Sequence, residues 1–211
     1  LHGISYSAAN AYGTFGALAN SAAISTGGLL TNNAVSNANA GALIGPAVAN
    51  SASIASGGLL SNNAVSSANA HTLIGPAAAN SAAIATGGLL GNSAASHASA
   101  SSLIGPASAN SVAIAGRKML MRAPPAASSG RKLRWLVAPF FGPGLFSNSA
   151  VSQADAMSMF GVADANSAAL ATGPQLFGNA YSGANAFGTF GGLANSAAIS
   201  TGGLLTNNAV S

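Results

Sequence analysis

The sequence contains no cysteine and very little charge, and both absences narrow the class of protein it can belong to. Without cysteine, neither a disulfide framework nor a thiolate metal site can form. Only 4% of the residues are charged, against roughly 25% in an ordinary soluble domain. Because copies of such a chain repel one another weakly, the composition favours self-association.

Long hydrophobic runs are also missing, although 49% of the residues are apolar. Most of these are alanine, and Ser, Asn and Gly interrupt every run before it approaches the roughly 18 to 20 apolar residues that cross a bilayer. We therefore expect no membrane span. The sequence begins at Leu1 without a signal-peptide pattern, so we expect any secretory signal to have been removed or to precede this stretch.

What the sequence does contain is a repeat. Two short motifs return at every thirtieth position: Gly-Gly-Leu-Leu at 27–30, 57–60 and 87–90, and Leu-Ile-Gly-Pro at 43–46, 73–76 and 103–106. Each unit divides into two looser halves of similar length, and residues 185–211 repeat residues 10–36 with two differences. A fixed period of this length is typical of solenoids and other stacked architectures.

The repeat favours strands over helices. Gly-Gly and Gly-Pro interrupt the chain at short intervals, and Gly and Pro cost a helix interior about 1 and 3 kcal/mol. The sequence predicts an all-β fold, either a β-solenoid with about 15 residues per coil within a 30-residue double repeat, or a cross-β assembly. Disorder before assembly and short Ala-rich helices are the alternatives.

The solenoid interpretation makes specific predictions about stacking. Ile24, Ile54 and Ile84 should stack inward with the Leu pairs beside them. Equivalent asparagines should form an amide ladder, namely Asn32, Asn62 and Asn92.

A foreign segment, residues 116–141, separates a repeat array over 1–115 from a diverged array over 142–211, and we expect it to be partly disordered. It holds Trp135 and every basic residue of the chain: Arg117, Lys118, Arg122, Arg131, Lys132 and Arg134. One interpretation is a basic tract that binds nucleic acid or an anionic surface. The favoured one is a shifted reading frame, since the codons of 118–122 and 127–131 permit Asn-Ala-Asn-Ala and Leu-Ile-Gly-Pro in another frame. Sequencing the transcript would distinguish the two.

Groups that support catalysis or metal binding are scarce. The acids are Asp155 and Asp164, and the histidines are His2, His71 and His97. Two carboxylates can perform acid/base chemistry and a histidine pair can bind a metal, but solvated surface positions explain both sets more simply. Neither a Gly-x-Ser-x-Gly elbow with its partners nor a P-loop is present. We predict a protein that is not an enzyme, with no catalytic, cofactor or metal site and no cofactor.

In its Ala-Ser-Gly-Asn units and lack of charge, nearly the whole chain resembles the silk, cuticle and eggshell proteins of arthropods. It lacks the strict Gly-Ala alternation and the long poly-Ala blocks of well-known silks. The resemblance implies a secreted, extracellular structural protein that assembles into a fibre, coat or layer. Its expected partners are copies of itself or related repeat proteins, with no nucleic acid, membrane span or small-molecule substrate.

An ice-binding β-solenoid is the alternative function, and an adhesin-type surface repeat is a third. Against ice binding, Thr26 is followed in the next units by Ser56 and Thr86, so no regular threonine array survives.

Overall fold

A computed structural model describes residues 2–88, 90–116 and 147–211, and within these ranges the regular structure consists of eleven strands and no helix. The all-β prediction is therefore confirmed. All strand pairs are parallel. The strands are β1 (His2–Gly13), β2 (Ala17–Thr26), β3 (Thr31–Ile44), β4 (Ala47–Ser56), β5 (Ser61–Ile74), β6 (Ala77–Thr86), β7 (Gly91–Ile104), β8 (Ala107–Gly116), β9 (Ser147–Phe160), β10 (Ala163–Gly188) and β11 (Gly192–Val210).

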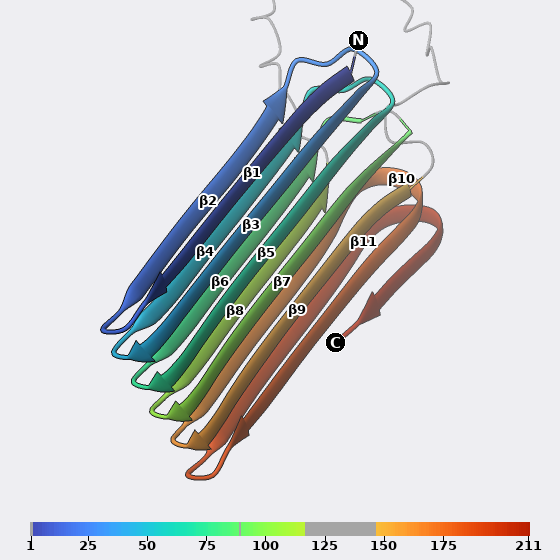
Figure 1. Ribbon diagram of the computed structural model, residues 1–211. Coiled ribbons are helices and arrows are strands. Elements are labelled where there is room, and N and C mark those ends of the chain that lie inside the picture. Colours follow the sequence, from blue (N-terminus) through green and yellow to red (C-terminus); the bar gives the residue numbers. More distant parts are fainter. Residues whose placement is uncertain (1, 89, 117–146) are drawn as a thin grey trace, which may run out of the picture.

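The strands coil into a β-solenoid with two faces (Figure 1). The long-strand face stacks β1, β3, β5, β7, β9, residues 177–188 of β10 and residues 206–210 of β11. The short-strand face stacks β2, β4, β6, β8, residues 163–172 of β10 and residues 192–201 of β11. The predicted β-solenoid is thus confirmed, and both predicted arrays belong to the same coil because β9 pairs with β7.

One turn of the coil takes 30 residues. The prediction of about 15 residues per coil is therefore wrong. Asn20 pairs with Asn50 and Asn50 with Asn80, one full repeat apart in each case. Each half-repeat forms one face instead of a whole turn, so serines that meet from opposite faces are 15 residues apart. The reason is that strands of 10 and 14 residues run nearly the full width of the coil, and a turn needs one strand in each direction.

Glycine makes the two corners of each turn. The Gly-Gly-Leu-Leu corner begins with a positive-φ residue such as Gly57 (φ 89°), and the Gly-Pro corner does the same at Gly75 (φ 132°). A Cβ at Gly75 would lie 2.5 Å from the carbonyl oxygen of Gly45 in the preceding turn. Only glycine combines this backbone conformation with so close an approach of two turns.

The interior is too narrow for large side chains. Every buried apolar side chain in the described ranges is an alanine, and serine supplies most of the buried polar groups. The alanines form two clusters, one on each side of a central line of serines. With so little apolar volume per turn, the continuous backbone ladders and the buried polar contacts carry much of the cohesion.

The predicted inward stacking of isoleucine is wrong in direction. Ile24, Ile54 and Ile84 do stack in register, but they point outward, and Ile24 is 60% exposed. Side chains alternate along a strand, and Ser21 and Ala23 take the inward phase. The Leu pairs of the first two units also lie outside, with Leu29, Leu30, Leu59 and Leu60 exposed at the corner. An interior that admits only Ala and Ser leaves no room for them.

The foreign segment enters at one corner without shifting the coil. Asn62 and Asn92 are 30 apart in sequence, while Asn92 and its next partner Asn148 are 56 apart, so the insertion lies between two adjoining turns. The six basic residues and Trp135 lie outside the described residues, and both interpretations of this segment stay predictions. Where the structure describes the chain, no helix has the length and apolarity to span a bilayer.

Candidate interaction face

The predicted amide ladder exists and lies inside the Gly-Gly-Leu-Leu corner. Asn62 is 1% exposed, and its Nδ2 donates to Asn92 Oδ1 at 3.1 Å and to the carbonyl oxygen of Thr86 at 2.9 Å. Its Oδ1 accepts from the backbone N–H of Gly58 at 3.0 Å and from Asn32 Nδ2 at 3.2 Å. Asn148 continues the ladder. These amides hold each corner closed and join it to the next turn.

A second ladder, made of serine, runs through the centre of the coil. Its hydroxyl oxygens are 2.8–3.0 Å apart and alternate between the two faces, so each hydroxyl can donate to one neighbour and accept from the other. Most members are 15 residues apart in sequence. They are Ser7, Ser21, Ser36, Ser51, Ser66, Ser81, Ser96, Ser111, Ser152, Ser167 and Ser182.

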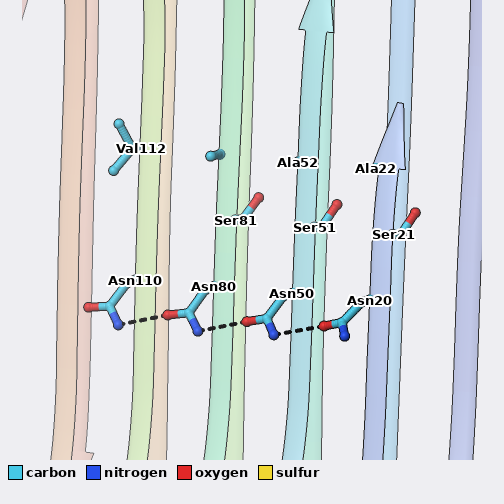
Figure 2. A pocket seen from close by; sticks show the side chains of 11 residues that line it. Asn20, Ser21, Ala22, Asn50, Ser51, Ala52, Asn80, Ser81, Asn110 and Val112 are labelled. Atoms are coloured by element: carbon cyan, nitrogen blue, oxygen red, sulfur yellow. Dashed lines mark hydrogen bonds between the residues drawn. The ribbon is translucent and has the colours of Figure 1, made fainter. Parts of the chain in front are cut away.

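A third ladder lies outside, on the short-strand face. From Asn50 onward, each asparagine of the row donates from Nδ2 to the Oδ1 of the previous turn at 2.8–3.1 Å (Figure 2). The row comprises Asn20, Asn50, Asn80, Asn110, Asn166 and Asn195. Because these side chains are exposed or half-buried, their bonds contribute less to stability than those of the buried ladder.

Beside this asparagine row runs a shallow groove with a floor of small side chains. It has a volume of about 560 Å³ over β2, β4, β6 and β8, and its lining includes Ala22, Ala52 and Ala82. Val112 stands in the same row of the face and carries two methyl groups where the other turns carry one (Figure 2). Beyond it the groove continues over β10 and β11 with about 240 Å³.

On the far side of the groove lies a row of large aliphatic side chains. Its members pair in register across all six strands of the short-strand face, and the end members are more than half exposed. They are Ile24, Ile54, Ile84, Ile114, Leu170 and Ile199. The next outward row runs from Thr26 to Thr201 and is interrupted by Ser56 and Gly116.

The outer rows of the long-strand face are mixed. One row holds Asn10, Asn39, Asn69, Ser99, Asp155 and Asn185 and is hydrogen-bonded along part of its length, whereas two other rows vary. The first of these two carries Ala8, Asn37, Ser67, His97, Gln153 and Gly183. The second carries Tyr12, Gly41, His71, Ser101, Met157 and Phe187. Both faces have the same alternation and the same inward Ala and Ser, so the coil itself does not require identical outer residues. On the short-strand face the four neighbouring rows from Asn20 to Thr26 are closely matched, whereas the row that begins at Leu18 varies and includes Asp164.

The structure separates the two acids that could have worked together. Asp155 lies on the long-strand face and accepts from Asn185 Nδ2 at 2.8 Å and Gln153 Nε2 at 3.1 Å. Asp164 lies on the short-strand face, where Asn166 Nδ2 donates to it at 3.2 Å. With the coil between them, these carboxylates cannot act on one substrate.

The histidines do not converge either. His2 Nδ1 lies 2.7 Å from Thr31 Oγ1, and His71 Nδ1 lies 3.3 Å from Ser101 Oγ. His71 and His97 occupy rows four residues apart on adjoining strands, which is about 13 Å along the strand direction. Within the described ranges, no three His, Cys, Asp or Glu side chains group as metal ligands do.

Fold and surface together define a two-faced parallel β-solenoid with four closely matched, uncharged outer rows on its short-strand face. No protein-family model matches the chain, and no curated protein or solved structure shows significant similarity to it. Sequence reasoning missed the serine ladder and the outer asparagine row. Both ladders had a signal in the sequence. Serine recurs every 15 residues from Ser21 to Ser111, which marks the central ladder. Asn-Ser-Ala recurs at 20–22, 50–52 and 80–82, which marks the outer asparagine row.

Proposed function

We propose that this chain is a non-catalytic, extracellular structural protein that assembles with copies of itself into a fibre, coat or layer. The regular short-strand face is the observation that carries the proposal. It presents rows of Asn, Ala and Ile that match from turn to turn, although all of them face outward.

The charge distribution supports assembly. All Lys and Arg residues fall between Arg117 and Arg134. Apart from histidine, the charged side chains on the two faces of the coil are therefore Asp155 and Asp164. Copies that approach face to face meet almost no like-charge repulsion. The partly exposed aliphatic row gains from leaving water, at about 25 cal/mol per Å² of apolar surface.

Cross-strand packing within one coil is a simpler reason for matching rows, since favourable side-chain pairs on neighbouring strands stabilise a sheet by about 0.2–1 kcal/mol per pair. That reason applies equally to the long-strand face. The row that runs from Asn37 through His97 to Gly183 shows that the coil tolerates mixed pairs. A contact with other molecules explains why the neighbouring rows of Asn20, Ala22 and Ile24 stay matched together.

Sedimentation velocity across a concentration series tests the proposal directly. We expect the average mass to rise with concentration, and electron microscopy of the concentrated protein should show fibres or sheets. Diffraction from that material should give a spacing of about 4.7–4.8 Å along the coil axis and one of about 10 Å between packed sheets. A protein that stays monomeric at millimolar concentration would contradict the proposal.

Ice binding is the second candidate, and the flat short-strand face favours it because its rows repeat about every 4.7–4.9 Å. Thr26, Thr86 and Thr172 lie in a single hydroxyl row, which Gly116 interrupts. The hydroxyl row that would bind ice is single and interrupted. The Ile and Ala rows that would contact another protein are more regular. Thermal hysteresis separates the candidates, since clear hysteresis from the monomer would place ice binding first.

A further inference from the structure

The order of rows on the short-strand face is complementary to itself. Across the face, outward positions follow the sequence Asn20, Ala22, Ile24, Thr26, and every turn keeps nearly the same order. We propose, on the basis of the proposed function, that this face packs against the same face of a second copy to form a mated pair. A two-fold axis parallel to the coil axis relates the two copies.

A two-fold axis placed between the alanine and isoleucine rows pairs large side chains with small ones. The Ile24 row of one copy then lies over the Ala22 row of the other, inside the groove, and the reverse pairing follows by symmetry. Such alternation of large and small residues is how packed layers fill space without voids. An isologous contact of this kind needs only one patch on each copy.

The same axis pairs the polar rows. Asn20 of one copy lies over the row of Thr26 in the other. Within the ladder, amides such as that of Asn50 use one N–H and one lone pair, so they have a second of each for a hydroxyl across the interface. Asn166 is the exception, because its Nδ2 donates to both Asn110 and Asp164. Asp164, the one acid on this face, lies two residues before Asn166, in the row that directly borders the four mated rows.

The mated area is sufficient for a stable complex. Residues 20–26 span about 23 Å at about 3.3 Å per residue, and six strands span about 29 Å at about 4.8 Å each. The two copies together would bury about 1,300 Å², within the range of about 1,200–2,000 Å² found in specific interfaces.

Val112 makes the proposal sensitive to a mild substitution. It stands in the alanine row, so in the mated pair it meets an isoleucine with two methyl groups where other turns have one. Val112→Ala removes this excess volume. Val151→Ala is the matched control, because Val151 points outward on the long-strand face with 41% exposure against 39% for Val112.

A second pair of variants places a lysine on each face. Ala82→Lys puts a charge in the groove, and the two-fold axis buries it twice per pair, where a lone charge is costly. Ala95→Lys adds the same charge to the long-strand face, in the row that contains Val65 and Val151.

The self-association constant, measured by sedimentation equilibrium with circular dichroism as a check of folding, decides the matter. We expect Val112→Ala to tighten association about fivefold and Ala82→Lys to weaken it at least about 100-fold, with Val151→Ala and Ala95→Lys near the parent value. Association that persists equally in all four variants would refute this interface while leaving the proposed function standing. Absence of association in the parent would refute both.

The symmetry has its own test, because the chain has no native cysteine. In an equal mixture of Ala82→Cys and Ile84→Cys proteins, a short bis-maleimide should join unlike variants more often than random pairing gives. Preferential joining of like variants would exclude the two-fold axis placed here.

Discussion

Two serine-to-alanine substitutions inside the same coil should change stability in opposite directions. Ser81 belongs to the central ladder, where its hydroxyl lies 2.9 Å from those of Ser66 and Ser96. Ser53 is fully buried, yet its hydroxyl has no hydrogen-bond partner. Both substitutions remove one oxygen from the interior and leave the shape nearly unchanged. They differ only in whether the removed hydroxyl was hydrogen-bonded.

The magnitudes come from these contacts. Ser81→Ala breaks two hydrogen bonds and leaves Ser96 without its acceptor, which costs about 2 kcal/mol. Ser53→Ala removes an oxygen whose burial is uncompensated and places an alanine between Ala23 and Ala83, its partners in the stack. We expect a gain of about 1 kcal/mol, the lower end of the cost of an unpaired buried polar group.

Thermal unfolding at low protein concentration, where association does not contribute, is the assay. At about 2–4 °C per kcal/mol for a chain of this size, the melting temperature should fall by about 6 °C for Ser81→Ala and rise by about 3 °C for Ser53→Ala. Ser67→Ala, outward on the long-strand face, is the control and should change little. A loss of similar size from both buried substitutions would refute the reasoning, since it would mean that the two hydroxyls are equally satisfied.

Other substitutions test the corners and the asparagines by urea unfolding. Gly75→Ala should cost about 3 kcal/mol, because its Cβ would lie 2.5 Å from a carbonyl oxygen and its φ is +132°. Gly27→Ala, with open space around it, should cost about 1 kcal/mol. Equal costs would contradict the close approach of the turns. Asn62→Ala removes four buried hydrogen bonds and should cost about 4 kcal/mol, against about 1 kcal/mol for Asn69→Ala in an outer row; the argument fails if Asn69 costs as much. Replacing 117–146 by Gly-Gly-Leu-Leu should keep the circular dichroism spectrum and raise the urea midpoint, because closing a longer loop costs about 0.6 kcal/mol per doubling; loss of the β spectrum would show that the coil needs this segment.

The repeat predicted the architecture because a fixed period leaves few alternatives. Gly-Gly and Gly-Pro at regular intervals exclude long helices, and side chains that recur at every thirtieth position must meet if the chain coils. The buried ladder of Asn32, Asn62 and Asn92 was predictable on the same grounds. Its position inside a glycine corner follows from the contact with the backbone N–H four residues earlier, as between Asn62 and Gly58.

The direction of the isoleucines was not predictable from hydrophobicity. Ile24 looked like a core residue because large aliphatic side chains are usually buried, but the width of the interior decides which side chains fit. That width is set by the many Ala and Ser residues in the opposite phase of the strands, such as Ser21 and Ala23. The predicted coil of about 15 residues was wrong for a related reason. The two halves of each repeat look alike in sequence, but they occupy opposite faces of one 30-residue turn.

The direction of the backbone hydrogen bonds gives the coil two different mechanical axes. Parallel strands bond to their neighbours along the coil axis, so a pull along that axis is carried by amide-to-carbonyl contacts between turns. A pull across it is carried by the covalent chain of each strand. A material built from aligned coils would therefore resist stretching far better across the stack than along it, and the orientation of the molecules would decide the direction in which the material first yields.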